Sequence, residues 1–194
     1  VSNQVNGIAH GSDGAVYAAN ESGRVFRFDE SQSRFTPVTE RRFGAIKSLA
    51  VDPLDRLWIG SDDDLSVLDP RSLSLDVFEE PFATDDRITV NYVTSISYVD
   101  NSEVWLGTTM KGVLVLNSLT RSFEALPYRS QAEAYVNKVS VDLSGRVWSA
   151  NNAGLTLFDR ETRTPLSTPD QNARHLNPPP SGINALFVDH QGAL

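Results

Sequence analysis

A fourfold repeat of short β-strands constrains this chain more than any other feature. Each copy contains a strand with an aromatic residue at a fixed place: GAVYAAN, DRLWIGS, SEVWLGT and GRVWSAN. These aromatic residues lie 41, 47 and 43 residues apart and include all 3 tryptophans; they are Tyr17, Trp58, Trp105 and Trp148. Strand and turn patterns that recur every 40–50 residues, roughly, are typical of a β-propeller with one four-stranded antiparallel blade per repeat.

The segments around each aromatic residue align in the same frame. A first strand precedes it, as in VNGIAHG and VNKVSVD, and a third strand follows it, as in RVFRFD and LTLFD. A weaker fourth strand comes last: RFTPV, LDVFE, SFEAL and TPLST. Tight turns rich in Gly, Asn, Asp and Ser separate these strands. We therefore predict an all-β chain with blades over residues 5–39, 46–78, 93–126 and 136–167.

A fifth copy begins near the end of the sequence. INALFVD, from Ile183, matches the other first strands, and the frame places the next aromatic residue one position beyond Leu194. Residues 183–194 are therefore expected to be a partial blade of a larger propeller. Four blades and one strand cannot close a ring, so we expect open apolar blade faces that favour self-association.

Charge and composition exclude several classes of partner. The formal net charge is −8, and no basic cluster offsets it, which argues against binding to nucleic acid or to an anionic membrane surface. No apolar run approaches the 18 residues or so that a membrane helix needs. The absence of cysteine excludes disulfides and thiolate zinc sites, although it says little about the compartment.

The sequence contains no recognisable catalytic or metal-binding motif. The nucleophile elbow, the phosphate-binding loop and the H-E-x-x-H pattern do not occur, and the 3 histidines are far apart in the repeat frame. Asp62 to Asp64 could suggest calcium, but the spaced ligands of a calcium loop are missing, which favours a solvated turn. Asp52 and Asp142 recur before the aromatic residue and are expected to cap turns. We predict no catalytic residue, metal or cofactor.

Candidate ligand-binding residues fall at the strand starts and in the long connections. One residue after each first-strand start is polar: Asn6, Lys47, Thr94, Asn137 and Asn184. These side chains could surround the mouth of the central channel and hydrogen-bond a ligand, or they could satisfy backbone groups at the strand starts. The connections 79–92 and 168–182 add Arg87, Tyr92, Arg174 and His175. Arginine with tyrosine would suit an acidic or glycan-like ligand, whereas the alternative is ordinary solvated loop residues.

The repeats resemble the two-component regulator propeller family. Its pattern, roughly D-x-x-G-x-L-W-x-G-T followed by G-L-x-x-F-D, is matched by VDLSGRVWSANNAGLTLFD, VDPLDRLWIGSDDDLSVLD and VWLGTTMKGVLVLN. Tyr17 for tryptophan, Asp64 for glycine and the missing aspartate before Trp105 depart from it. The resemblance implies seven-bladed propellers and a periplasmic, non-catalytic, ligand-sensing domain of a membrane-anchored bacterial protein. In such proteins the output domain is usually a histidine kinase or a diguanylate cyclase.

Two other functions remain open from the sequence. One is a propeller enzyme of the virginiamycin-lyase or gluconolactonase kind, although the first strands supply no metal or His/Glu constellation. The other is a protein-binding scaffold like a WD-repeat propeller. The position of an exposed apolar patch would separate a partner surface from a small-ligand site. The fold alone cannot decide, because propellers serve all three functions.

Overall fold

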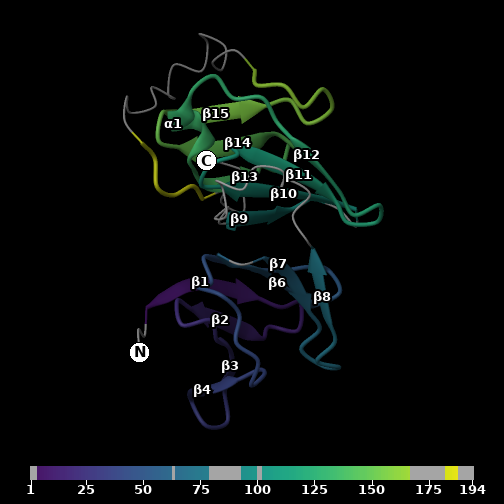
Figure 1. Ribbon diagram of the computed structural model, residues 1–194. Helices are drawn as coiled ribbons and strands as arrows, with labels where there is room; N and C mark the ends of the chain where they lie inside the picture. The colour runs from purple at the N-terminus through teal and green to yellow at the C-terminus, as the bar shows by residue number, and fades with distance from the viewer. Residues whose placement is uncertain (1–3, 63, 79–92, 100–101, 167–181, 188–194) are drawn as a thin grey trace. The chain divides into compact units, whose positions relative to one another are not determined.

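The computed structural model describes residues 4–62, 64–78, 93–99, 102–166 and 182–187 (Figure 1). The chain divides into two compact units, residues 1–96 and 97–194. The boundary falls within one strand, β9 (Val93–Tyr98), whose hydrogen-bonded neighbour is a strand of the second unit.

The first unit contains the first two blades, each a four-stranded antiparallel meander. Blade one has the strand order β1-β2-β3-β4, with β1 (Val5–His10), β2 (Val16–Asn20), β3 (Val25–Asp29) and β4 (Arg34–Pro37). Blade two has the order β5-β6-β7-β8, with β5 (Ser48–Val51), β6 (Leu57–Gly60), β7 (Leu65–Leu68) and β8 (Leu75–Phe78). The predicted meanders are confirmed here.

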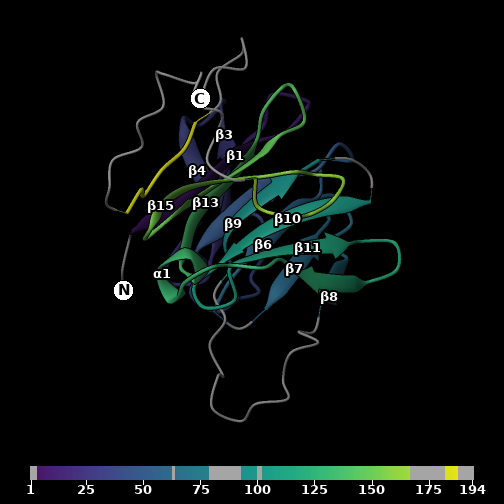
Figure 2. The ribbon, with the colours of Figure 1, turned by 90° about the horizontal axis from the view of Figure 1, so that it is seen from above.

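The second unit contains blades three and four. Blade three has the order β12-β11-β10-β9, in which β10 (Glu103–Thr108), β11 (Val113–Asn117) and β12 (Ser122–Ala125) follow β9. Blade four has three strands, β13 (Val136–Val141), β14 (Val147–Asn151) and β15 (Gly154–Phe158). Figures 1 and 2 show these two sheets side by side, with the short helix α1 (Gln131–Ala134) against β14.

The second-to-third-strand turns depend on glycine. Gly23 in blade one and Gly112 in blade three have φ values of +78° and +69°, which glycine adopts without strain. Space also matters at Gly23, because a Cβ there would overlap the carbonyl oxygen of Phe43. The Phe43 amide donates to the Gly23 carbonyl at 3.0 Å, so this turn holds the connection to the next blade.

The aromatic residues that mark the repeat frame lie in the core. Tyr17, Trp58, Trp105 and Trp148 are 4%, 1%, 0% and 2% exposed. Tyr17 packs in a cluster with Leu57 and Ile59 of blade two. Trp105 packs in a second cluster with Val136 and Phe158 of blade four. In blades one and three this residue therefore packs between its own blade and the following one.

The structure differs from the prediction in three places. The fourth strand of blade four is reduced to one bridge between Phe158 and Pro165 in the described residues. Residues 182–187, expected to start a first strand, form no strand. Helix α1 was not predicted; it is one turn long, and the Ser130 side chain caps it by accepting from the Glu133 amide.

Candidate functional site

The polar residue at the first-strand start joins neighbouring blades. In both β1 and β13 the register shifts at this residue, which makes it the extra residue of a β-bulge. The Asn6 Nδ2 atom donates to the Ile46 carbonyl at 2.9 Å, and the Asn137 Nδ2 atom donates to the Ile183 carbonyl at 2.9 Å. The Ile46 carbonyl precedes the first strand of blade two, and the Ile183 carbonyl belongs to the segment 182–187. These two asparagines therefore satisfy backbone groups, which is the second of the two interpretations given for them in the sequence analysis.

The other predicted residues divide into described and undescribed ones. The Lys47 Nζ atom lies 3.7 Å from the Glu21 carboxylate in the β2–β3 turn. Thr94 is half-buried in β9. Arg87, Tyr92, Arg174 and His175 lie outside the described residues. The proposed ligand role of all these residues therefore stays a prediction.

Three carboxamides converge at the start of β13. The Asn137 Nδ2 atom is 3.2 Å from Asn152 Oδ1 and 3.4 Å from Asn184 Oδ1. Asn152 and Asn184 are exposed, and Asn137 is half-buried. The sequence pattern predicts Asn137 and Asn184 but misses Asn152, because Asn152 lies in the β14–β15 turn and meets the others only in the fold. We call these three residues the asparagine cluster.

The repeated aspartates before the tryptophans are structural, as predicted. Asp142 accepts from the Ser144 and Arg146 amides, from Arg146 Nε at 2.7 Å and from Trp148 Nε1 at 2.9 Å. Asp52 makes the corresponding four bonds in blade two. Burial opposes ionisation of Asp142, but the bonds from Trp148 and Arg146 outweigh burial, so its pKa lies below the ordinary value.

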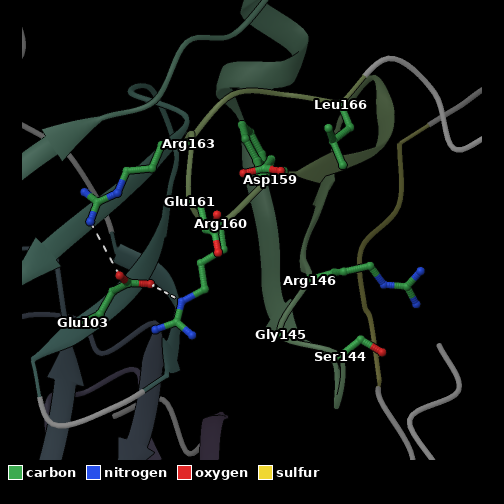
Figure 3. A pocket seen from close by; sticks show the side chains of 10 residues that line it. Glu103, Ser144, Gly145, Arg146, Asp159, Arg160, Glu161, Arg163 and Leu166 are labelled. Atoms are coloured by element: carbon green, nitrogen blue, oxygen red, sulfur yellow. Dashed lines mark hydrogen bonds and ion pairs between the residues drawn. The ribbon is translucent and has the colours of Figure 1, made fainter.

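In blade three a different carboxylate accepts the hydrogen bond from the tryptophan indole. Val99 occupies the position six residues before Trp105, where blades two and four have aspartate, and Glu103 accepts from Trp105 Nε1 at 2.6 Å. Glu103 also binds two arginines of blade four, with Arg160 Nε at 2.8 Å and Arg163 Nη2 at 3.5 Å (Figure 3). The indole is thus held by a carboxylate whose cationic partners come from the neighbouring blade.

A hollow of about 590 Å³ lies beside this ion-pair network. It lies between the β13–β14 turn and the segment after β15, and it is lined by Glu103, Ser144, Arg146, Asp159, Arg160 and Arg163, among others (Figure 3). Three guanidinium groups are already committed, Arg146 to Asp142 and the others to Glu103. Blade one has a hollow of about 540 Å³ at the corresponding turns. Recurrence at one place in the repeat indicates a feature of the scaffold rather than a dedicated site.

Metal-ligating side chains do not gather in the described part of the chain. No group of three or more His, Asp or Glu side chains there could hold a metal ion. Asp64 serves its own turn, since its Oδ1 atom accepts from the Ser66 hydroxyl at 2.7 Å. Among the described residues, no helix has the length and hydrophobicity that a membrane crossing requires.

Comparisons with known proteins point to one fold. A scan against family models gives no match, and neither does a search of curated proteins. Two crystal structures of the extracellular domain of BT4673 from B. thetaiotaomicron, a protein assigned to hybrid two-component systems in one and to one-component systems in the other, align with 98% of this chain. Their TM-scores are 0.76 and 0.75, and their identities are 17% and 16%.

A third similar structure is an enzyme. Virginiamycin B lyase from Staphylococcus aureus aligns with 87% of this chain, with a TM-score of 0.66 and 10% identity. The alignment covers 57% of the lyase, whereas the chain spans 25% of each BT4673 structure. At such identities the similarity defines the fold alone. The chain therefore has a propeller-type all-β fold, as its repeats predict, and it resembles the extracellular domain of a two-component system protein.

Proposed function

We propose that this chain is an extracytoplasmic ligand-sensing propeller domain of a bacterial membrane-bound signalling protein and is not itself catalytic. The observation that carries the proposal is the similarity to the BT4673 extracellular domain over 98% of this chain. The family resemblance of the repeats supports the same function. The membrane anchor and an output domain, a histidine kinase or a diguanylate cyclase, would lie outside these 194 residues.

The asparagine cluster is the part of the described chain best suited to bind a ligand. A carboxamide offers two N–H donors and a carbonyl acceptor, which pair readily with hydroxyl groups. The Asn152 and Asn184 side chains are exposed, and neither Nδ2 atom has an acceptor among the described residues. A ligand bound there would contact β13, the β14–β15 turn and the segment after Gly182 together. Binding would thus bring three separate segments into one arrangement, which a sensor requires.

A ligand screen with a matched variant tests this proposal. The melting temperature of the chain would be followed against small polyhydroxylated compounds and oligosaccharides, since a ligand that binds only the folded state raises it. Asn184→Ala should abolish the shift, because it removes an exposed carboxamide of the cluster. Asn117→Ala, which alters an exposed turn after β11, should leave the shift unchanged. A shift that survives Asn184→Ala would place the ligand elsewhere, and a screen with no shift would contradict ligand sensing by this chain.

A lyase is the second candidate, because virginiamycin B lyase is among the similar structures. The purified chain would be incubated with virginiamycin B, and the products would be followed by mass spectrometry. We expect no conversion above a protein-free control. Conversion by the chain would replace the sensing proposal with the enzymatic one.

A further inference from the structure

Lys138 differs from the other charged residues of the inner strands. It lies on β13 and is half-buried. Lys47, near the start of the corresponding strand in blade two, has a carboxylate partner in Glu21. The Lys138 ammonium group has no hydrogen-bond or ion-pair partner among the residues that the structure describes. Desolvation by burial lowers its pKa. An ammonium group in such a place is costly unless an anion joins it.

The bulge in β13 places Lys138 on the same side of the sheet as Asn137. Val136 and Val139 both pack in the cluster around Trp105, although residues three apart in a regular strand point to opposite faces. The register shift between Val136 and Lys138 accommodates the extra residue. Because Val136 and Val139 share that face, the two residues between them, Asn137 and Lys138, lie off it together. Their Cα atoms are consecutive and so about 3.8 Å apart.

Blade one shows that the fold does not need a lysine here. Gly7 occupies the corresponding position, and Asn6 before it makes the same bond to the next blade as Asn137 does. A Cβ on Gly7 would lie only 2.8 Å from the Leu49 Cβ, so blade two closes directly against this position. The fourth blade retains the bulge and the asparagine bond, but at the position of Gly7 it carries the long cationic side chain of Lys138.

We propose that Lys138 and the asparagine cluster together bind a small polyhydroxylated acid, with the ammonium group on its carboxylate and the carboxamides on its hydroxyl groups. This inference rests on the proposed sensing function and specifies the ligand class. The ammonium group supplies a charge-assisted bond to an anion. The Nδ2 groups of Asn152 and Asn184 supply neutral donors beside it.

The decisive experiment compares acids with their neutral counterparts. Binding of glucuronate, galacturonate and gluconate, and of glucose and galactose, would be measured by calorimetry on the full chain at low ionic strength. At least one acid should bind more tightly than the neutral sugars. Lys138→Met should lower the affinity for that acid by about tenfold or more, since one charge-assisted bond is lost. Lys111→Met, which removes the lysine of the β10–β11 turn in blade three, should leave the affinity unchanged.

A second readout reports on the lysine itself. The chain has only three lysines, Lys47, Lys111 and Lys138, so dimethylation with a ¹³C label gives three lysine signals to assign, besides that of the α-amino group. The bound acid should raise the titration midpoint of the Lys138 signal, because an anion favours the ammonium form. Lys138→Met should melt at the same or a higher temperature than the wild type, because it removes a desolvated charge.

Failure of this inference is distinguishable from failure of the sensing proposal. If the screen yields a neutral ligand whose binding requires Asn184 but not Lys138, the proposed acid site is wrong and the sensing proposal stands. If no acid binds and none moves the Lys138 midpoint, the acid site is wrong. An acid that moves only the Lys138 midpoint, with output of the full-length membrane protein unchanged, would support the site and contradict sensing.

Discussion

Replacing Asp142 by alanine tests how the repeat holds its tryptophan. The Asp142 side chain is 2% exposed, and the Trp148 indole that it binds is 2% exposed as a residue. The substitution leaves the indole N–H buried without an acceptor, at a cost of about 1–3 kcal/mol. It also removes two amide bonds of the turn, each contributing about 1 kcal/mol before water replaces them. The Arg146 guanidinium is 53% exposed, so its ion pair adds little. We expect a total loss of about 3–4 kcal/mol in the free energy of unfolding.

The matched control is Asp159→Ala. Asp159 caps the turn after β15 by accepting from the Thr162 amide at 2.7 Å, but it holds no buried donor. Its loss should be clearly smaller, because water can reach the exposed turn. Urea unfolding would be followed by tryptophan fluorescence in a Trp58→Phe background, in which Trp105 and Trp148 report on the second unit alone. Equal losses for the two aspartates would refute the argument that the buried indole sets the cost.

Three further predictions concern charge, glycine and the blade-three carboxylate. Unfolding free energy should fall as the pH drops below about 4, because the carboxyls with lowered pKa bind fewer protons folded than unfolded; urea midpoints between about pH 6 and pH 3 check this. The carboxyls concerned are Asp29, Asp55, Asp69, Asp142 and Asp159. Gly145 has a φ of +75° and open space around it, so Gly145→Ala should lower the free energy of unfolding by about 1–2 kcal/mol. Gly23→Ala should lower it by about 3 kcal/mol or more, because the added Cβ would also meet the Phe43 carbonyl. Similar urea midpoints for the two variants would contradict the crowding at Gly23. Glu103→Gln should cost about 1 kcal/mol, since Arg160 and Arg163 are 35% and 30% exposed, and thermal melts should show the loss shrinking in high salt. A salt-independent loss would mean that the arginines are not its cause.

The strands and their frame could be predicted because their signals are local. Period-two alternation, the turn residues and the position of Trp58, Trp105 and Trp148 lie within short windows of sequence. The fold then places these residues in the core, as expected. Helix α1 also has a local signal, since Ser130 and Glu133 have the spacing of a capping box. One turn of helix is too short for hydrophobic periodicity to reveal it.

The site depends on contacts that the sequence does not show. The pattern marks Asn6 and Asn137 as polar, but their bonds to Ile46 and Ile183 depend on a bulge and on the next blade. In blade three Glu103 takes the place of the turn aspartate, and its partners Arg160 and Arg163 lie 57 and 60 positions later in the chain. Lys138 can be read as a substitution for Gly7, yet its burial and its lack of a partner among the described residues appear only in three dimensions.

The bonds of the two strand-start asparagines, Asn6 and Asn137, form in an order that the direction of protein synthesis sets. The carbonyl that Asn6 binds lies 40 residues later in the chain, and the carbonyl that Asn137 binds lies 46 residues later. Strands β1 and β13 pair within their own blades, but the side-chain bond of each asparagine needs a segment that is made later. Because the chain grows from the N-terminus, Asn6 and Asn137 are made before the carbonyls that they bind, and each bond forms only after the following segment has emerged.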